Sequence, residues 1–364
     1  MRSIAMLIYD TSLIGGAERI SLMLANDLKD YRITLISVFQ EKGKTILPVR
    51  PDIKQYVISD ETVRIPLHLI GFSNKIAQIL KEEEVDMLVA VTAGVNSLAA
   101  LAARKAQLPW LYWEHSNLKN NTYGLKHRLR QWIGVRTACH IVTLSEADRQ
   151  FFCETFRLDK NFVTAIPNYF SFTPPTQPYR IDCKRIVSVG RLKSIKQFDH
   201  AIAVASKVFD RHPDWTWDIY GEGDERSHLE SLIRQFNLEK HVFLKGSHPN
   251  PVDILSEYSF LVVCSRYEGG PIVVQEAQSQ LLPTISYDCP IGPRTLIDDG
   301  VNGYLVKDQD QEDLAHKINY LIDHPEIRLA FSKKANKDLG QYTKEVVTEK
   351  WRQLFLKLLL GEES

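Results

Sequence analysis

The sequence has few cysteines and none of the cysteine pairs that hold zinc or form a redox centre. Its 364 residues include five cysteines, which are scattered and contain no C-x-x-C pair: Cys139, Cys153, Cys183, Cys264 and Cys289. This pattern argues against a disulfide framework and a zinc site, and it predicts reduced thiols. We also expect no signal peptide, because Asp10 interrupts the first apolar run.

The sequence also lacks a charge excess and a convincing membrane span. Lys plus Arg and Asp plus Glu both total 45, which argues against a dedicated nucleic-acid binder. The best apolar stretch, residues 87–103, contains Thr92, Gly94, Asn96 and Ser97 and divides more naturally into a strand and a helix. We therefore predict a cytoplasmic protein, either soluble or peripheral on the inner face of the plasma membrane.

What the sequence does contain is a regular alternation of strand-like and helical patterns. Short β-branched apolar runs, typical of buried parallel strands, occupy residues 3–9, 32–39, 86–91, 110–115, 140–145, 185–190, 215–221, 242–246, 260–265, 284–288 and 303–306. Helical patterns separate many of them, as at 17–28, 198–209 and 228–238. This order predicts the α/β class with doubly wound sheets.

A proline-rich segment divides the chain into two expected domains. Residues 167–182 contain four prolines and few aliphatic residues, and a new strand follows. We predict one Rossmann-like domain over residues 1–170 and a second over residues 171–344. The helix expected at 345–364 has an apolar face and is predicted to return to the first domain.

Two loops at predicted carboxyl ends of strands carry residues suited to an anion. Gly15 and Gly16 follow the first strand and open a helix, although an ordinary tight turn explains them equally well. Arg191 and Lys196 follow a strand that ends at Gly190, and a guanidinium with an ammonium suits a diphosphate. In isolation, these two cations would more often be solvated surface residues.

A third loop, residues 220–226, contains a G-x-G pattern. It is not a nicotinamide fingerprint, because Arg226 stands in place of the last glycine. We interpret it as a glycine-rich loop on the ligand side of the sheet.

The most specific pattern is "SRYEGGPIVVQEAQS" at 265–279. Gly269 and Gly270 precede a predicted helix, and Pro271 suits its first position. The helix N-terminus would stand beside Glu268. Glu276 lies more than one turn into the helix, where a carboxylate can accept hydrogen bonds from two ribose hydroxyls.

Taken together, these motifs resemble the GT-B family of retaining glycosyltransferases that use nucleotide sugars, across nearly the whole chain. The E-x7-E pattern fits at Glu268 and Glu276, and "GGAER" and "YWEHSN" resemble the family's acceptor-binding domain. The resemblance implies two Rossmann-like domains facing across a cleft, an acceptor-binding domain at 1–170 and a donor-binding domain at 171–344.

The resemblance also implies roles for ten residues. Arg191 and Lys196 would bind the donor diphosphate and Glu276 the ribose. Glu268, Gly269, Gly270 and Pro271 would meet the donor sugar, Gly15 and Gly16 would face the reacting centre, and His115 would approach the sugar. Four of these, Glu268, Arg191, Lys196 and His115, are the predicted catalytic residues.

The implied reaction is front-face substitution, in which the departing phosphate takes the acceptor proton and configuration is retained. Arg191, Lys196 and the helix N-terminus would stabilise the charge on the leaving phosphate. We expect no metal and no cofactor, with the nucleotide sugar as substrate. Asp308 and Asp310 spell "DQD", but they lie in a polar loop after a strand and are more simply interpreted as loop residues.

A basic segment in the first half suggests how an acceptor is reached. Residues 115–145 hold Lys119, Lys126, Arg128, Arg130 and Arg136 but no acid between Lys119 and Arg136, and apolar residues are interleaved with them. A basic amphipathic helix at 119–136 would touch the membrane surface, or it would be the solvated face of a core-packed helix.

The predicted function is therefore transfer of a hexose or N-acetylhexosamine from a nucleotide sugar, with a UDP-sugar expected, to a lipid-linked oligosaccharide in bacterial surface polysaccharide assembly (capsule, O-antigen of lipopolysaccharide). Three alternatives stay open. These are a transferase acting on teichoic acid, protein or a soluble acceptor, a catalytically silent nucleotide-sugar-binding protein, and a Rossmann oxidoreductase. The missing glycine at Arg226 counts against the last.

Overall fold

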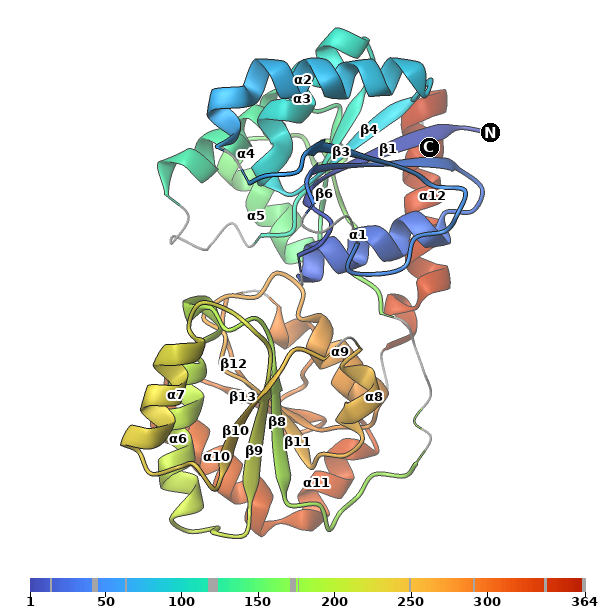
Figure 1. The fold of residues 1–364 in the computed structure, drawn as a ribbon. Coiled ribbons are helices and arrows are strands. Elements are labelled where there is room, and N and C mark those ends of the chain that lie inside the picture. The colour runs from blue at the N-terminus through green and yellow to red at the C-terminus, as the bar shows by residue number, and fades with distance from the viewer. Residues whose placement is uncertain are drawn as a thin grey trace. The chain divides into compact units, whose positions relative to one another are not determined.

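The computed structural model describes residues 1–13, 15–40, 45–62, 64–116, 124–170, 175, 177–248, 250–290, 292–336 and 339–361. The chain forms two compact units (Figure 1). Unit 1 comprises Met1–Tyr169 and Lys344–Ser364, and unit 2 comprises Phe170–Thr343. These limits differ by one residue from the domain limits that the proline-rich segment suggests.

Unit 1 contains a seven-stranded parallel sheet in the order β3-β2-β1-β4-β5-β6-β7. Its strands are β1 (Ser3–Asp10), β2 (Arg32–Phe39), β3 (Lys54–Ser59), β4 (Met87–Val91), β5 (Trp110–Trp113), β6 (His140–Thr143) and β7 (Val163–Ala165). Its helices are α1 (Gly16–Asp27), α2 (Ile65–Glu82), α3 (Asn96–Ala106), α4 (Leu125–Thr137), α5 (Glu146–Phe156) and α12 (Lys344–Leu360). The edge strands β3 and β7 are absent from the sequence-based expectation.

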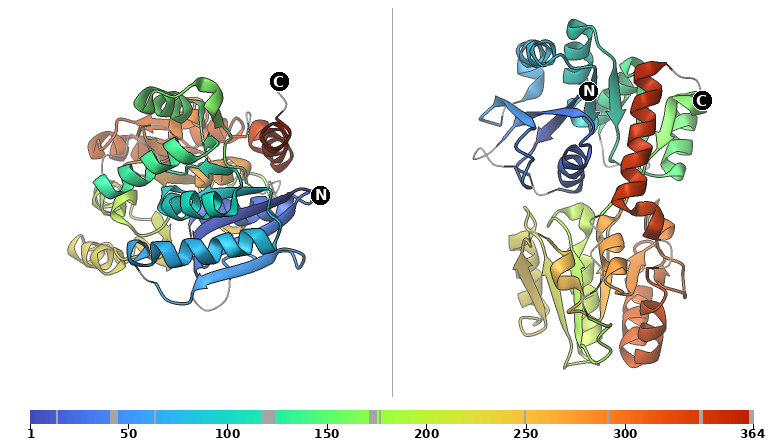
Figure 2. Two further views of the ribbon diagram at one scale, coloured as in Figure 1. Left: turned by 90° about the horizontal axis from the view of Figure 1, so that it is seen from above. Right: turned by 90° about the vertical axis from the view of Figure 1, so that its right-hand side faces the viewer.

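Helices cover both faces of this sheet, as continuous apolar strands require. Helices α2, α3, α4 and α5 pack on the face that carries Ala5, Leu7 and Leu88. Helix α12 packs on the opposite side of the sheet (Figure 2). There the Trp113 ring of β5 lies 4.7 Å from the Trp351 ring of α12. The prediction that the last helix returns to the first domain is therefore confirmed.

Unit 2 contains a six-stranded parallel sheet in the order β10-β9-β8-β11-β12-β13. Its strands are β8 (Arg185–Val189), β9 (Thr216–Tyr220), β10 (Val242–Gly246), β11 (Phe260–Val263), β12 (Thr284–Tyr287) and β13 (Gly303–Val306). Its helices are α6 (Phe198–Phe209), α7 (Arg226–Gln235), α8 (Val252–Leu255), α9 (Ile272–Ser279), α10 (Gln311–Asp323) and α11 (Pro325–Ser332).

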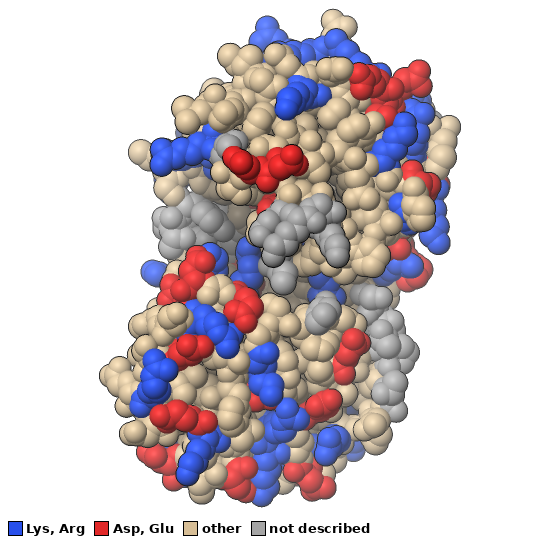
Figure 3. Space-filling view, in the orientation of Figure 1, with Lys and Arg blue, Asp and Glu red and all other residues tan. Residues whose placement is uncertain are grey.

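The two faces of the second sheet carry separate apolar clusters. Helices α6, α7, α10 and α11 pack on the side of Trp217 and Phe260, and helices α8 and α9 pack on the side of Val187 and Leu261. On the surface that Figure 3 shows, basic and acidic side chains of unit 2 alternate without an extended region of one sign.

The segment 87–103 folds as predicted, into strand β4 and most of helix α3. Within the described part of the chain, no helix combines the length and the apolar character that crossing a bilayer requires. Both sheets are fully parallel and doubly wound, so the α/β prediction is confirmed.

Candidate active site

The strand order of unit 2 reverses between β8 and β11, and we call the carboxyl ends of these two strands the β8–β11 crevice. Because α6 and α9 leave these strands toward opposite faces of the sheet, the loops that precede them diverge. Open α/β sheets bind ligands at this position. The backbone N–H of Arg266, after β11, donates to the carbonyl of Ile195, after β8, at 2.9 Å. This hydrogen bond therefore links the loop after β8 to the loop after β11.

Two predicted site residues meet directly in this crevice. The Lys196 Nζ donates to Glu268 Oε1 at 2.6 Å. The exposed fractions of these side chains are 24% and 10%, so the pair is mostly withdrawn from water. A partly buried pair fixes the ammonium more firmly than a solvated one would. The structure thus favours a positioned Lys196 over the solvated surface cation that its sequence context alone favoured.

The Arg191 backbone is held by the neighbouring glycine loop, while its side chain is exposed. The N–H of Leu192 donates to the carbonyl of Glu222 at 2.9 Å. Gly221 has a φ of 151°, and a Cβ there would lie 1.8 Å from the carbonyl oxygen of Gly190. A Cβ on Gly223 would lie 2.3 Å from the Leu192 oxygen. The G-x-G pattern therefore exists for close backbone approach to the Arg191 loop.

Helix α9 begins at Ile272, one residue later than the sequence suggests. Pro271 is its N-cap residue, with φ −73° and ψ 87°. The expectation that Pro271 occupies the first helical position is wrong, because this ψ lies outside the helical region. Gly269 and Gly270 precede the helix in the loop that carries Glu268. Glu276 is the fifth helical residue and only 2% exposed.

Gly292 is a site residue that sequence reasoning missed. Its φ is 115°, and a Cβ would lie 3.0 Å from the Glu268 Cβ and 3.1 Å from the Glu268 carbonyl oxygen. Only glycine allows this backbone to lie against Glu268. Its position two residues after Pro290 and directly before Pro293 was the available signal.

The "DQD" sequence is explained in part by helix capping. The Asp310 Oδ1 accepts a hydrogen bond from the backbone N–H of Asp313 at 3.0 Å, at the start of α10. Burial raises the pKa of the Asp308 carboxyl. Among the described residues, no three His, Cys, Asp or Glu side chains gather as a metal site would need. Metal-independent catalysis stays a prediction for experiment.

In unit 1 the predicted residues lie at two strand ends with one strand between them. Gly15, in extended conformation, is the N-cap of α1, and its carbonyl accepts from the Arg19 N–H at 3.0 Å. Gly16 is the first residue of that helix. His115 follows β5, and β4 separates β5 from β1. The sheet therefore presents the glycine loop and His115 at the same edge, on either side of the end of β4.

The His115 imidazole is held neutral by its surroundings. Its ring centroid lies 4.4 Å from that of Trp113, and burial lowers its pKa to about 3. The Nε2 atom is buried and has no hydrogen-bond partner among the described residues. A neutral imidazole at pH 7 can donate or accept a hydrogen bond to a sugar, but it cannot supply a positive charge.

Glu114 is a second residue that sequence reasoning missed. It is 2% exposed, and its Oε1 accepts from the Ser116 N–H at 2.8 Å and the Ser116 Oγ at 2.7 Å. Its Oε2 accepts from the Tyr112 hydroxyl and from Gln131 Nε2 at 3.0 Å. These four donors satisfy the carboxylate without a cation and tie the His115 loop to α4.

Two histidines with lowered pKa values, the buried His140 and the half-buried His115, predict a loss of stability at low pH. Burial lowers the pKa of His115 to about 3 and that of His140 to about 4. Because the unfolded value is about 6.5, the unfolded chain binds more protons below that pH. We expect each histidine to cost about 1–2 kcal/mol of unfolding free energy at pH 5. Calorimetry at pH 7.5 and pH 5 measures this.

The variant His140→Gln should lose part of this pH dependence while keeping the pH 7.5 midpoint within a few degrees. A wild-type midpoint that is unchanged between the two pH values would contradict the assignment of both histidines as neutral in the folded protein.

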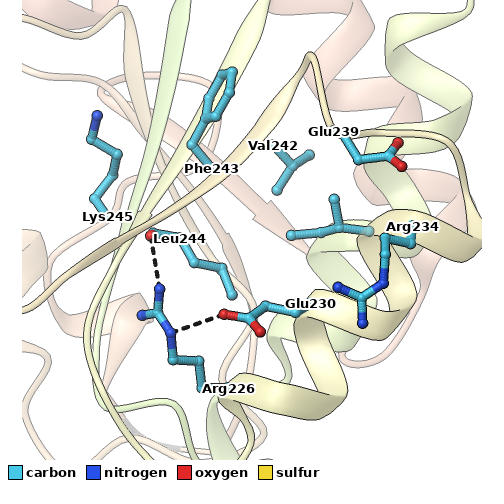
Figure 4. A pocket seen from close by; sticks show the side chains of 9 residues that line it. Arg226, Glu230, Arg234, Glu239, Val242, Phe243, Leu244 and Lys245 are labelled. Atoms are coloured by element: carbon cyan, nitrogen blue, oxygen red, sulfur yellow. Dashed lines mark hydrogen bonds and ion pairs between the residues drawn. The ribbon is translucent and has the colours of Figure 1, made fainter.

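A groove of about 520 Å³ lies elsewhere in unit 2, between α7 and β10 (Figure 4). Arg226 crosses it, donates to the Leu244 carbonyl at 3.3 Å and pairs with Glu230 at 3.0 Å. The groove is two strands from the β8–β11 crevice and contains none of the predicted site residues. It is therefore an edge feature of the sheet, separate from the candidate site.

The part of the expected basic segment that the structure describes forms helix α4. It begins at Leu125, and Lys119 lies outside the described residues. Its apolar residues Leu125, Leu129 and Trp132 are 84%, 58% and 50% exposed. The face packed on the sheet instead carries Gln131, Gly134 and Val135. The exposed surface of α4 therefore carries an apolar stripe of Leu125, Leu129 and Trp132, with basic side chains beside it.

Two family models together span most of the chain. Residues 14–170 match the model of Glycosyltransferase Family 4, and residues 178–338 match that of Glycosyl transferases group 1. With the two doubly wound sheets, these matches identify the chain as a member of the GT-B glycosyltransferases. This result excludes the oxidoreductase alternative.

Individual relatives agree with this assignment. An uncharacterized glycosyltransferase of Haemophilus influenzae is 28% identical over 97% of this chain and 99% of its own length. The amylovoran biosynthesis glycosyltransferase AmsD of Erwinia amylovora is 26% identical over 97% and 99%. A mutant of Staphylococcus aureus TarM, solved with fondaparinux, alpha-GlcNAc-glycerol and UDP, superposes with a TM-score of 0.83 at 17% identity, over 98% of this chain and 100% of that chain.

Proposed function

We propose that this glycosyltransferase is a retaining enzyme that moves a hexose or N-acetylhexosamine from a UDP-sugar to a lipid-linked oligosaccharide. The observation that carries the proposal is the Lys196–Glu268 pair at the β8–β11 crevice, 2.6 Å between Nζ and Oε1. The uridine nucleotide is supported by the TarM structure, which contains UDP. The relative AmsD, named for amylovoran biosynthesis, supports a role in polysaccharide biosynthesis, and we propose that this role is assembly of a surface polysaccharide, in capsule or O-antigen.

In the proposed reaction the bond between the sugar anomeric carbon and the diphosphate oxygen breaks. Negative charge then grows on the leaving phosphate, and Lys196, Arg191 and the N-terminus of α9 stabilise it. The acceptor hydroxyl attacks the same face of the sugar and gives its proton to the departing phosphate oxygen. Glu276 holds the ribose hydroxyls, and Glu268 with Gly269 and Gly270 contacts the sugar.

The test is product analysis after incubation with a panel of UDP- and GDP-sugars and a short-chain polyprenyl-diphosphate-linked sugar. We expect one UDP-sugar to be consumed, EDTA to leave the rate unchanged, and the NMR coupling of the product anomeric proton to match that of the donor. An inverted anomer would sink the retaining mechanism. Loss of activity in EDTA that Mg²⁺ or Mn²⁺ restores would sink metal independence.

One observation favours a second candidate, transfer to a glycerol-type or other soluble acceptor. The TarM structure holds alpha-GlcNAc-glycerol. Faster transfer to glycerol phosphate than to the polyprenyl-linked sugar in the same assay would select this candidate. Nucleotide-sugar binding without turnover on either acceptor would select a catalytically silent protein.

The exposed surface of α4 supports the lipid-linked acceptor. Lys126, Arg128 and Arg136 accompany the exposed apolar stripe of Leu125, Leu129 and Trp132 on this helix. A helix with exposed apolar residues between cations suits the surface of an anionic membrane. The proposed contact is peripheral, on the cytoplasmic face of the membrane.

The change Leu129→Ser with Trp132→Ser is expected to reduce binding to vesicles containing phosphatidylglycerol by roughly tenfold or more. Co-sedimentation with these vesicles, and with vesicles of phosphatidylcholine alone, measures the effect. Leu67→Ser on α2 is the matched control, because Leu67 is 78% exposed but lies outside α4. Equal binding of all three proteins would contradict the α4 contact.

A further inference from the structure

Thr92 is the first residue beyond the carboxyl end of β4. The strand order of unit 1 reverses between β1 and β4, so the crevice of this sheet lies at these two strand ends. Along the sheet edge, Gly15 follows β1 on one side of β4, and His115 follows β5 on the other. Thr92 therefore lies between the two predicted site segments of unit 1.

The backbone of Thr92 adopts a conformation that its side chain disfavours. Its φ is 69° and its ψ is 157°. Among the non-glycine residues with positive φ in the described chain, Thr92 alone is β-branched. Gln107 and Arg157 lie in the left-handed helical region, with ψ of 43° and 52°, but the ψ of Thr92 lies far outside it. The region that Thr92 occupies is essentially restricted to glycine.

The surrounding fold holds Thr92 in place. Its N–H donates to the Trp113 carbonyl of β5 at 2.9 Å. The residues that follow form the 3-10 turn Ala93–Val95, in which Ala93 and Val95 are fully buried. Glycine would satisfy the same hydrogen bond without strain. The backbone conformation therefore does not explain why residue 92 is a threonine, and its side chain must have another role.

Compared with glycine, threonine adds a hydroxyl at this position, and no described residue forms a hydrogen bond with it. The side chain is half-buried, and the Thr92 hydroxyl has no hydrogen-bond partner among the described residues. Its oxygen would lie 3.4 Å from a Cβ on Gly94, so glycine leaves the space beside it open. At the end of the neighbouring strand β5, the buried Nε2 of His115 also lacks a partner within the described chain.

We propose that Thr92 is a carbohydrate-binding residue of unit 1, whose hydroxyl exchanges hydrogen bonds with a hydroxyl of the acceptor sugar. A threonine hydroxyl donates once and accepts twice, as a sugar hydroxyl does, so the two groups are complementary. Strained residues persist where surrounding structure enforces them, and they cluster at ligand sites. The inference rests on the proposed function for the identity of the sugar as acceptor.

The test compares Thr92→Ser, Thr92→Val and Thr92→Gly in the full chain. Saturation-transfer NMR with methyl α-glucoside and methyl N-acetyl-α-glucosaminide reports sugar binding. We expect wild type and Thr92→Ser to bind at least one glycoside, and Thr92→Val, which keeps the shape but not the hydroxyl, to bind it about fivefold more weakly. Thr92→Gly should bind weakly while its unfolding midpoint rises by about 2–4 °C.

The opposite signs for stability and binding separate a ligand role from a structural one. Wild-type affinity in Thr92→Val, or binding of neither glycoside by wild type, would overturn the proposal. An unfolding midpoint for Thr92→Gly no higher than that of wild type would overturn the argument from strain. UDP titrated into the same samples reports on unit 2, so failure of the donor site is seen separately from failure at Thr92.

Discussion

Replacing Lys196 by alanine is expected to lower kcat/KM for the nucleotide sugar by roughly 100- to 1,000-fold. In the structure its Nζ lies 2.6 Å from Glu268 Oε1, in a pair that is mostly withdrawn from water. The Lys196 ammonium is therefore already positioned to stabilise the negative charge of a diphosphate that leaves at this crevice. Because charge on the phosphate grows toward the transition state, kcat should fall as well as the affinity for the donor. Initial rates over a range of donor concentrations measure both.

Lys193 provides a matched control for this change. It lies three residues earlier in the same loop and pairs with Asp224, but both side chains are well exposed, at 44% and 81%. Surface pairs of this kind contribute little. Lys193→Ala should therefore stay within about threefold of wild type. Equal losses in Lys193→Ala and Lys196→Ala would mean that general positive charge, rather than a positioned ammonium, assists the reaction.

Replacing Gly221 by alanine is expected to destabilise unit 2 by more than about 3 kcal/mol. The new Cβ would lie 1.8 Å from the Gly190 carbonyl oxygen, which is backbone and cannot rotate aside. The backbone that carries Arg191 would have to move, so UDP affinity should fall together with stability. Chemical denaturation and UDP titration on the same protein measure the two effects.

The variant Gly300→Ala is a control that measures the conformational cost of positive φ without a steric clash. Its φ is 70°, and no atom lies within 4 Å of a Cβ placed there. Gly300→Ala should therefore cost only about 1 kcal/mol and leave UDP affinity unchanged. If Gly221→Ala behaved like Gly300→Ala, the close approach of the two loops would not be needed to position Arg191.

The interior strands could be predicted from the sequence because they are continuous apolar runs buried on both faces. The sequence also indicates the edge strands β10 and β13 of unit 2, but it does not indicate the edge strands β3 and β7 of unit 1, for two different reasons. In β3, the residues Lys54 and Gln55 are exposed, and the alternation is weak. Strand β7 has only three residues, Val163–Ala165. Three residues are too few for an apolar pattern to indicate a strand.

The expected strands also extended too far at their carboxyl ends. The apolar pattern predicts strands that include residues 114–115 and 264–265, but β5 ends at Trp113 and β11 at Val263. Most of these residues are buried like strand residues, yet they belong to ligand-side loops. Burial there serves the position of Glu114 and His115 rather than the sheet, and a hydrophobic pattern cannot separate the two causes.

The motifs brought Lys196 and Glu268 together correctly, because each follows a strand next to the reversal point of the same sheet. Gly292, Glu114 and Thr92 were missed for a common reason. Gly292 matters through its approach to Glu268, Glu114 through donors on β5 and α4, and Thr92 through a backbone conformation. Each depends on a tertiary neighbour or a dihedral angle, which no local sequence pattern encodes.

The most direct measurement for the central claim is calorimetric titration of UDP into wild type, Lys196→Ala and Glu276→Gln. Glu276→Gln keeps the size of the side chain, which is 2% exposed, so the fold should be retained. We predict that wild type binds UDP and that both variants bind at least about tenfold more weakly, since each loses a charge-assisted contact. Unchanged UDP affinity in both variants, with circular dichroism showing folded proteins, would contradict a donor site at the β8–β11 crevice.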